Sequence, residues 1–120
     1  MPHATLEVSA NLRESADLLL ETLVASCERS GLFDAAVIMG RAVVHERFRV
    51  RQQGASAFAS VRLRLRPGRD AGVLAELSRD VVRGIGAILS ARGSKEITCV
   101  TCEIEEIDVR TRALLLCGGA

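Results

Sequence analysis

The sequence has no long apolar run and no surplus of either charge. No stretch approaches the ~20 apolar residues that a membrane-spanning helix needs, and Met1-Pro2-His3 lacks the basic start and apolar stretch of a signal peptide. Lys and Arg total 16 against 15 for Asp and Glu, which argues weakly against nucleic acid or an acidic membrane surface as a partner. We therefore expect a cytoplasmic protein with neither a nucleic-acid nor a membrane partner.

Tryptophan and tyrosine are absent, and Lys95 is the only lysine among many arginines. A guanidinium group keeps its charge at all ordinary pH values and matches a carboxylate with two parallel hydrogen bonds. An enzyme that acts on carboxylates would use some of these arginines, and their positions in the chain must decide which.

Metal-ligating and redox residues are also few. Cys99 and Cys102 have the spacing of a redox or zinc pair, but there is no second pair, and residues three apart in a strand point to opposite faces. His3 and His45 have no nucleophile or second ligand nearby in sequence, so we interpret them as surface or hydrogen-bonding histidines. We expect reduced thiols in the cytosol, no metal and no cofactor. The four thiols belong to Cys27, Cys99, Cys102 and Cys117.

The first half of the chain predicts a strand, a helix and a second strand. Residues 4–8 alternate between apolar and polar, as in a half-buried strand. Asn11 stands three residues before Glu14, which is a helix-start signature, and Gly31 offers a left-handed stop. Residues 35–44 are apolar and rich in β-branched side chains, which favours a second strand ending near residues 41–45. The residues at helical spacing are Leu12, Ala16, Leu19, Leu23 and Cys27.

The second half predicts the same order again. Residues 58–66 alternate strongly, Pro67-Gly68 ends this strand, and Asp70 can cap the next helix, which runs to Gly93. Gly84-Ile-Gly86 lies within that helix without a preceding strand, so close helix packing explains it better than a phosphate loop. Residues 97–107 predict a fourth strand. The apolar helix positions are Val73, Leu77, Val81, Ile85 and Ile88.

This order predicts an α/β (α+β) fold in which two β-α-β units form a four-stranded sheet with both helices on one face. We expect one domain over residues 1–120, with units at about 2–45 and 58–107 and a tail at 108–120. The other face of the sheet combines arginines with glutamates on neighbouring strands, which indicates a solvated or interface-paired face more simply than a polyanion site. This mixed-charge face is too wide for an isolated sheet, so we expect oligomerisation to cover it. Its charged residues are Glu7, Arg62, Arg64, Arg66, Glu103 and Glu105.

Several segments resemble the 5-carboxymethyl-2-hydroxymuconate isomerases of the tautomerase superfamily. They include the start Met1-Pro2-His3, the segment from Glu7 through Asn11-Leu-Arg-Glu14 to Ala16-Asp17-Leu18, and the late strand Cys102-Glu-Ile-Glu-Glu-Ile107. Between them, Ser30-Gly-Leu-Phe33, Gly40-Arg41 with His45, and Pro67-Gly-Arg69 also fit the family pattern. The resemblance covers most of the chain, to about residue 108.

The resemblance implies an isomerase whose catalytic base is the amine of Pro2, exposed when Met1 is removed. It also implies that Arg41 and Arg69 hold the carboxylates of a small dicarboxylate substrate and stabilise the dienolate. Family members use no cofactor and assemble as trimers, so a homotrimer is expected here. A neutral secondary amine is a useful base, and nearby guanidinium groups with partial burial lower its pKa toward the working pH.

Two alternatives stay open, because Glu46 replaces an aromatic residue that is common in the family and because the tail departs from the family. One is a related reaction on another oxo acid, such as tautomerisation of an arylpyruvate or decarboxylation of a 3-oxo acid, with Pro2 still the key group. The other is a trimeric scaffold that kept the fold and lost the chemistry.

Overall fold

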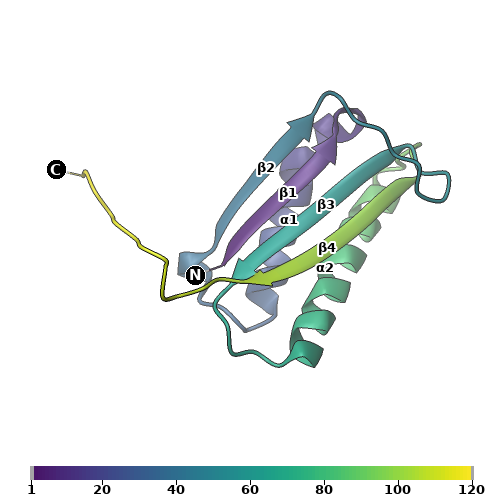
Figure 1. Ribbon diagram of the computed structural model, residues 1–120. Coiled ribbons are helices and arrows are strands. Elements are labelled where there is room, and N and C mark those ends of the chain that lie inside the picture. Colours follow the sequence, from purple (N-terminus) through teal and green to yellow (C-terminus); the bar gives the residue numbers. More distant parts are fainter. Residues whose placement is uncertain (1, 120) are drawn as a thin grey trace.

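The computed structural model describes residues 2–119, and all their side chains except that of Ala35. Four strands lie side by side, and the two α-helices cover one face of the sheet (Figure 1). The elements follow in the order β1 (His3–Ser9), η1 (Ala10–Ser15), α1 (Ala16–Arg29), η2 (Ala35–Val37), β2 (Met39–His45), β3 (Ala57–Leu65), α2 (Ala71–Ala91) and β4 (Thr98–Glu106).

The sheet consists of two β-α-β units joined along an antiparallel pair. The strand order is β2-β1-β3-β4; β1 is parallel to β2, β3 is parallel to β4, and β1 is antiparallel to β3. These pairings confirm the four-stranded sheet with two helices. They also place the starts of β1 and β2 beside the ends of β3 and β4, at what we call the Pro2 end of the sheet. There Met39 N donates to Pro2 O at 3.1 Å, and Ile107 N donates to Leu65 O at 2.6 Å.

The core lies between the sheet and the helices. The alternation in β1 and β3 places apolar side chains on the helix side, where Leu6, Leu63 and Leu65 are almost completely buried. The predicted positions Leu12 in η1 and Ala16, Leu19, Leu23 and Cys27 in α1 are all buried, which confirms the helical spacing. Fully burying a leucine contributes about 1.5–3 kcal/mol, so this layer holds the helices on the sheet.

Three details of the sequence prediction were wrong. Residues 35–37 form a 3-10 helix rather than the start of β2, since the side chain of Asp34 accepts from Ala36 N at 3.0 Å and turns the chain. Asn11 lies inside η1 and does not cap α1; its amide donates to Ser56 O at 3.0 Å. In α2, Val73 is exposed, and Leu89 takes the core position one turn beyond Ile85.

The face of the sheet away from the helices, called the open face, is polar and charged, as predicted. Arg62 Nε lies 3.2 Å from Glu105 Oε1, and Arg64 Nε lies 3.9 Å from Glu105 Oε2. His45 Nε2 lies 3.3 Å from Glu7 Oε1. Arg66 follows the last residue of β3 and so lies just outside the strand. The predicted charged surface therefore exists, with ion pairs between neighbouring strands.

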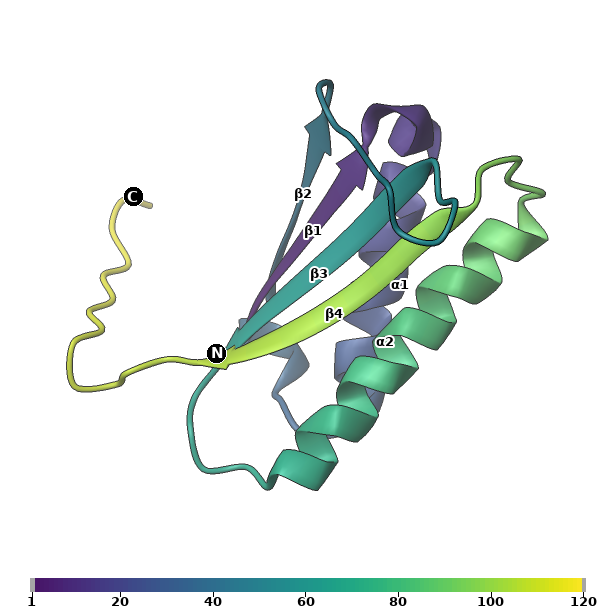
Figure 2. The same ribbon diagram turned by 45° about the vertical axis from the view of Figure 1, so that its right-hand side comes forward.

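The tail after β4 leaves the Pro2 end and projects away from the body of the molecule (Figures 1 and 2). It carries consecutive leucines, of which Leu115 is 82% and Leu116 is 88% exposed. Within residues 2–119, neither helix combines the length and apolar character required to cross a membrane.

Candidate functional site

Pro2 lies directly before β1 at the Pro2 end of the sheet, with its side chain fully buried. Its carbonyl oxygen accepts the hydrogen bond from Met39 N, so the start of β1 is fixed against the start of β2. Met1, whose removal the sequence analysis expects, lies outside the described residues. The strand pairing thus holds the residue that the sequence singles out in a defined position.

Arg41 lies on β2 opposite Thr5 of β1 and reaches back along the open face toward Pro2. Its Nε donates to Thr5 Oγ1 at 3.2 Å, and its Nη2 lies 3.2 Å from Nδ1 of His3, the neighbour of Pro2. No carboxylate among residues 2–119 forms an ion pair with Arg41, so its positive charge is not neutralised by a direct partner. The structure therefore brings Arg41 near the start of β1.

A cavity of about 650 Å³ lies between the Pro2 end and the tail, and we call it the tail cavity. Its polar lining residues include His3, Arg64 and Arg112, together with the acidic Asp108. Its apolar lining residues are Met39, Ile107 and residues 113–116. Such a cavity suits an anion that carries a hydrocarbon chain.

His3 sits among positive charges in this cavity. Burial lowers the pKa of His3 below its usual value of 6.5, and the guanidinium groups of Arg41, Arg112 and Arg64 lower it further. His3 is consequently a neutral imidazole near pH 7. The sequence analysis interpreted it as an ordinary hydrogen-bonding histidine, and it does form such a contact with Arg41.

Arg69 lies in the loop between β3 and α2, and it does not line the tail cavity. Its Nη2 donates to Leu32 O at 2.9 Å and its Nη1 donates to Arg66 O at 3.1 Å. Its guanidinium carbon lies 4.9 Å from the centre of the Phe33 ring, within the range of a cation–π interaction. These contacts tie the β3–α2 loop to the segment after α1, at the same end of the sheet as Pro2.

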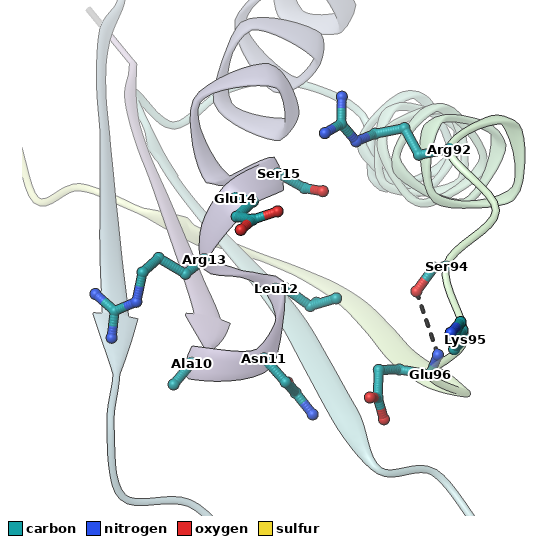
Figure 3. Close-up of a pocket in the computed structure, with 10 residues that line it drawn as sticks. All are labelled: Ala10, Asn11, Leu12, Arg13, Glu14, Ser15, Arg92, Ser94, Lys95 and Glu96. Atoms are coloured by element: carbon teal, nitrogen blue, oxygen red, sulfur yellow. Dashed lines mark hydrogen bonds between the residues drawn. The ribbon is translucent and has the colours of Figure 1, made fainter.

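A second cavity, of about 480 Å³, lies at the opposite end of the sheet (Figure 3). It is formed by η1 and by the turn between α2 and β4, where Ser94 Oγ accepts from Glu96 N at 3.4 Å. Both cations and carboxylates line it, with Arg13, Glu14, Arg92 and Lys95 among its residues. None of the three predicted site residues lies there.

Two residues of the tail cavity, Arg64 and Arg112, were not predicted as site residues. The alternation of β3 placed Arg64 on the charged face, and the residue was interpreted only as part of that face. Arg112 lies in the tail, where no periodicity gave a signal.

Cys99 and Cys102 point to opposite faces of β4, as expected for residues three apart: Cys102 packs against the core, whereas Cys99 lies in register with Phe58 on the open face.

The comparisons with known proteins agree on the fold. A structure of a 5-carboxymethyl-2-hydroxymuconate isomerase from Deinococcus radiodurans R1 is 24% identical, with a TM-score of 0.79 over 95% of this chain and 88% of that one. A fused 4-OT described as a symmetric trimer is 21% identical, with a TM-score of 0.61 over 88% and 85%. FG41 malonate semialdehyde decarboxylase is 9% identical, with a TM-score of 0.72 over 94% and 88%. No curated protein matched.

The strongest finding concerns the family. The family model of 5-carboxymethyl-2-hydroxymuconate isomerase matches residues 2–113, which include Pro2, both predicted arginines and all the helices and strands. The chain therefore belongs to the 5-carboxymethyl-2-hydroxymuconate isomerase family, a family of tautomerase-type isomerases.

Proposed function

We propose that the chain isomerises an unsaturated 2-oxo or 2-hydroxy acid of the 5-carboxymethyl-2-hydroxymuconate type, in which the muconate chain carries two carboxylates and the carboxymethyl arm a third, with the free amine of Pro2 as the base. Pro2 takes a proton from one carbon or oxygen of the substrate and returns it at another carbon, so the reaction needs no oxidant and no cofactor. The observation that carries the proposal is the position of Pro2 at the start of β1, where its neighbour His3 contacts Arg41 and lines the tail cavity together with Arg64.

The surroundings of Pro2 suit a secondary amine that must be neutral to act. Burial of the Pro2 side chain favours the neutral form of an amine at this position, and we expect the charge of Arg41, which contacts the neighbouring His3, to act in the same direction. Arg41 then has two roles, because it also attracts a carboxylate and stabilises the negative charge of a dienolate. Its contacts with Thr5 and His3 hold the guanidinium in place before the substrate arrives.

Arg69 is the second proposed carboxylate ligand. A guanidinium has five N–H donors, and Arg69 uses its Nη1 and Nη2 groups on two backbone carbonyls. The remaining donors can bind an anion while these contacts fix the side chain. The position of its loop at the Pro2 end of the sheet supports this role.

We also propose a homotrimer in the cytoplasm. The open face carries ion pairs on a surface that no helix covers, and the fused 4-OT relative is described as a symmetric trimer. Joining the sheets of three copies would cover this face. Sedimentation that shows a stable monomer would contradict this part of the proposal.

The test uses the terminal amine itself. General base catalysis typically contributes about 10²–10⁴-fold in rate, so Pro2→Ala, or a form that retains Met1, should lose most ketonisation of a hydroxymuconate. The matched control is Pro67→Ala, which changes the only other proline and leaves the terminal amine intact. The mass of the native protein shows whether Met1 is removed. Activity that survives both Pro2→Ala and retained Met1 would refute the proposal.

A related reaction on another oxo acid is the second candidate, favoured by the similarity of the fold to a malonate semialdehyde decarboxylase. A panel of arylpyruvates, 3-oxo acids and hydroxymuconates separates the two reactions. Retained Met1 together with no turnover of any of these substrates would instead indicate the non-catalytic scaffold.

A further inference from the structure

His3 and Arg64 lie opposite each other on neighbouring strands, next to the proposed base. The register pairs His3 of β1 with Arg64 of β3, and both residues line the tail cavity. The Cα atom of His3 lies about 3.8 Å from that of Pro2, because the two residues are adjacent in the chain. A ligand in this cavity therefore lies beside the strand start that carries Pro2.

The contact with Arg41 determines which nitrogen of His3 carries the proton. A guanidinium group can only donate hydrogen bonds, so the Arg41 Nη2 contact at 3.2 Å requires Nδ1 of His3 to be the acceptor. A neutral imidazole with an accepting Nδ1 carries its proton on Nε2. His3 consequently offers one N–H donor at Nε2, held in orientation by Arg41.

Among residues 2–119, the charge of Arg64 is only loosely matched. Its Nε lies 3.9 Å from Glu105 Oε2, beyond hydrogen-bond distance, while Arg62 binds the other oxygen of that carboxylate at 3.2 Å. Asp108, the acidic residue in the cavity lining, is held by Arg110 through two contacts of 3.0 Å. The wall formed by His3 and Arg64 therefore has more positive than negative charge available to a ligand.

We propose that His3 and Arg64 form a carboxylate subsite in the tail cavity, in which His3 Nε2 donates a hydrogen bond and Arg64 supplies the charge. This inference rests on the proposed function. A molecule of the 5-carboxymethyl-2-hydroxymuconate type carries a carboxyl group on its carboxymethyl arm beyond the two of the muconate chain. Arg41 and Arg69 account for two carboxylates, and the subsite takes the third. The apolar wall of Met39 and Ile107 contacts the hydrocarbon chain.

Saturated acids test the subsite without requiring turnover. The probes are 2-(carboxymethyl)hexanedioate, which has three carboxylates, and adipate, which lacks the carboxymethyl arm. A hydrogen bond to a charged group changes affinity by roughly tenfold or more, so calorimetry on the mature protein should show about that preference for the triacid. Arg64→Gln should abolish the preference. The control Arg83→Gln, on an exposed arginine of α2 that pairs with Asp80, should keep it.

The two histidines of the chain provide an independent reading by proton NMR, even if Arg64→Gln folds poorly. The triacid should shift the His3 resonances and raise the pKa of His3, because a carboxylate beside it favours the imidazolium form. His45, which lies at the other end of β1 in register with Ser9, should keep its resonances. Adipate should perturb His3 less.

Equal affinity for the triacid and adipate, or a preference that survives Arg64→Gln, would overturn the subsite. An equal response of His3 and His45 would also overturn it, since that would indicate a general effect of anions. Because neither probe can react, a protein that binds the triacid through Arg64 but turns over no hydroxymuconate keeps the subsite and refutes only the proposed catalysis.

Discussion

Gly40 of β2 allows α1 to approach the sheet closely, and substitution by alanine tests this packing. A Cβ atom at residue 40 would lie 2.9 Å from Val24 Cγ2 and 3.3 Å from Leu20 Cδ1. Such overpacking costs roughly 1–3 kcal/mol. Gly40 does not have a positive φ, so alanine fits the backbone and recovers about 0.4–1 kcal/mol by restricting the unfolded chain. We therefore expect Gly40→Ala to lower the free energy of unfolding by roughly 1–2 kcal/mol.

Urea denaturation followed by circular dichroism measures this change, with Gly86→Ala as the matched control. A Cβ atom at Gly86 in α2 would meet nothing within 4 Å, and alanine in a helix interior is better than glycine by roughly 0.5–1 kcal/mol. The two substitutions add the same methyl group and should change stability in opposite directions. If Gly40→Ala stabilised the protein as much as Gly86→Ala, the close approach of α1 to β2 would be refuted.

Three further predictions concern buried and titrating groups. Burial raises the pKa of Cys27 to about 11, so Cys27 should resist alkylation at pH 8 until the protein unfolds, whereas the exposed Cys117 should react first in a mass-resolved thiol assay. Ser9→Ala should destabilise the protein by roughly 1–3 kcal/mol in urea titrations, because Ser9 Oγ accepts from the half-buried Phe58 N at 3.0 Å; an unchanged midpoint would contradict this. The pKa of His3 is lower in the folded than in the unfolded chain, so its contribution to stability is present above pH 6.5 and is lost as the pH falls through the folded-state pKa. The fall should be smaller in His3→Gln, and an equal fall would exclude this origin.

Periodicity sufficed to predict the helices and strands, because each amphipathic segment encodes which face it buries. It failed at residues 35–37, where a short apolar run is compatible with either a strand or a helical turn. The useful signal was Asp34, whose side chain can accept from the backbone two residues later. In α2, Val73 and Leu89 lie on the same stripe as the buried residues. Which end of this stripe is buried depends on where the helix rests on the sheet, and local spacing does not determine that.

The candidate site was predictable only where the sequence carried a family pattern. Pro2 and Arg41 were predicted in this way and stay predictions; the structure places Arg41 in contact with His3, the neighbour of Pro2. The alternation of β3 indicated which face Arg64 occupies, but its position beside His3 depends on the register between β1 and β3. That register forms between segments about sixty residues apart and has no local signature. Arg112 could not be found, since the tail has no repeating pattern.

The two β-α-β units place equivalent strand starts at opposite ends of the sheet. Pro2 precedes β1, and Ser56 occupies the corresponding position before β3, where its Oγ donates to Glu96 Oε2 at 2.5 Å. A polypeptide has a single amino terminus, so only one of these two strand starts can carry a terminal amine that acts as a base. A circular permutant opened before Ser56 would move the terminal amine to this end of the sheet, beside the hydrogen-bond partner of Glu96, which lines the cavity shown in Figure 3. Under the proposed mechanism, the direction of the chain, and not the symmetry of the architecture, thus determines which end of the sheet carries the base.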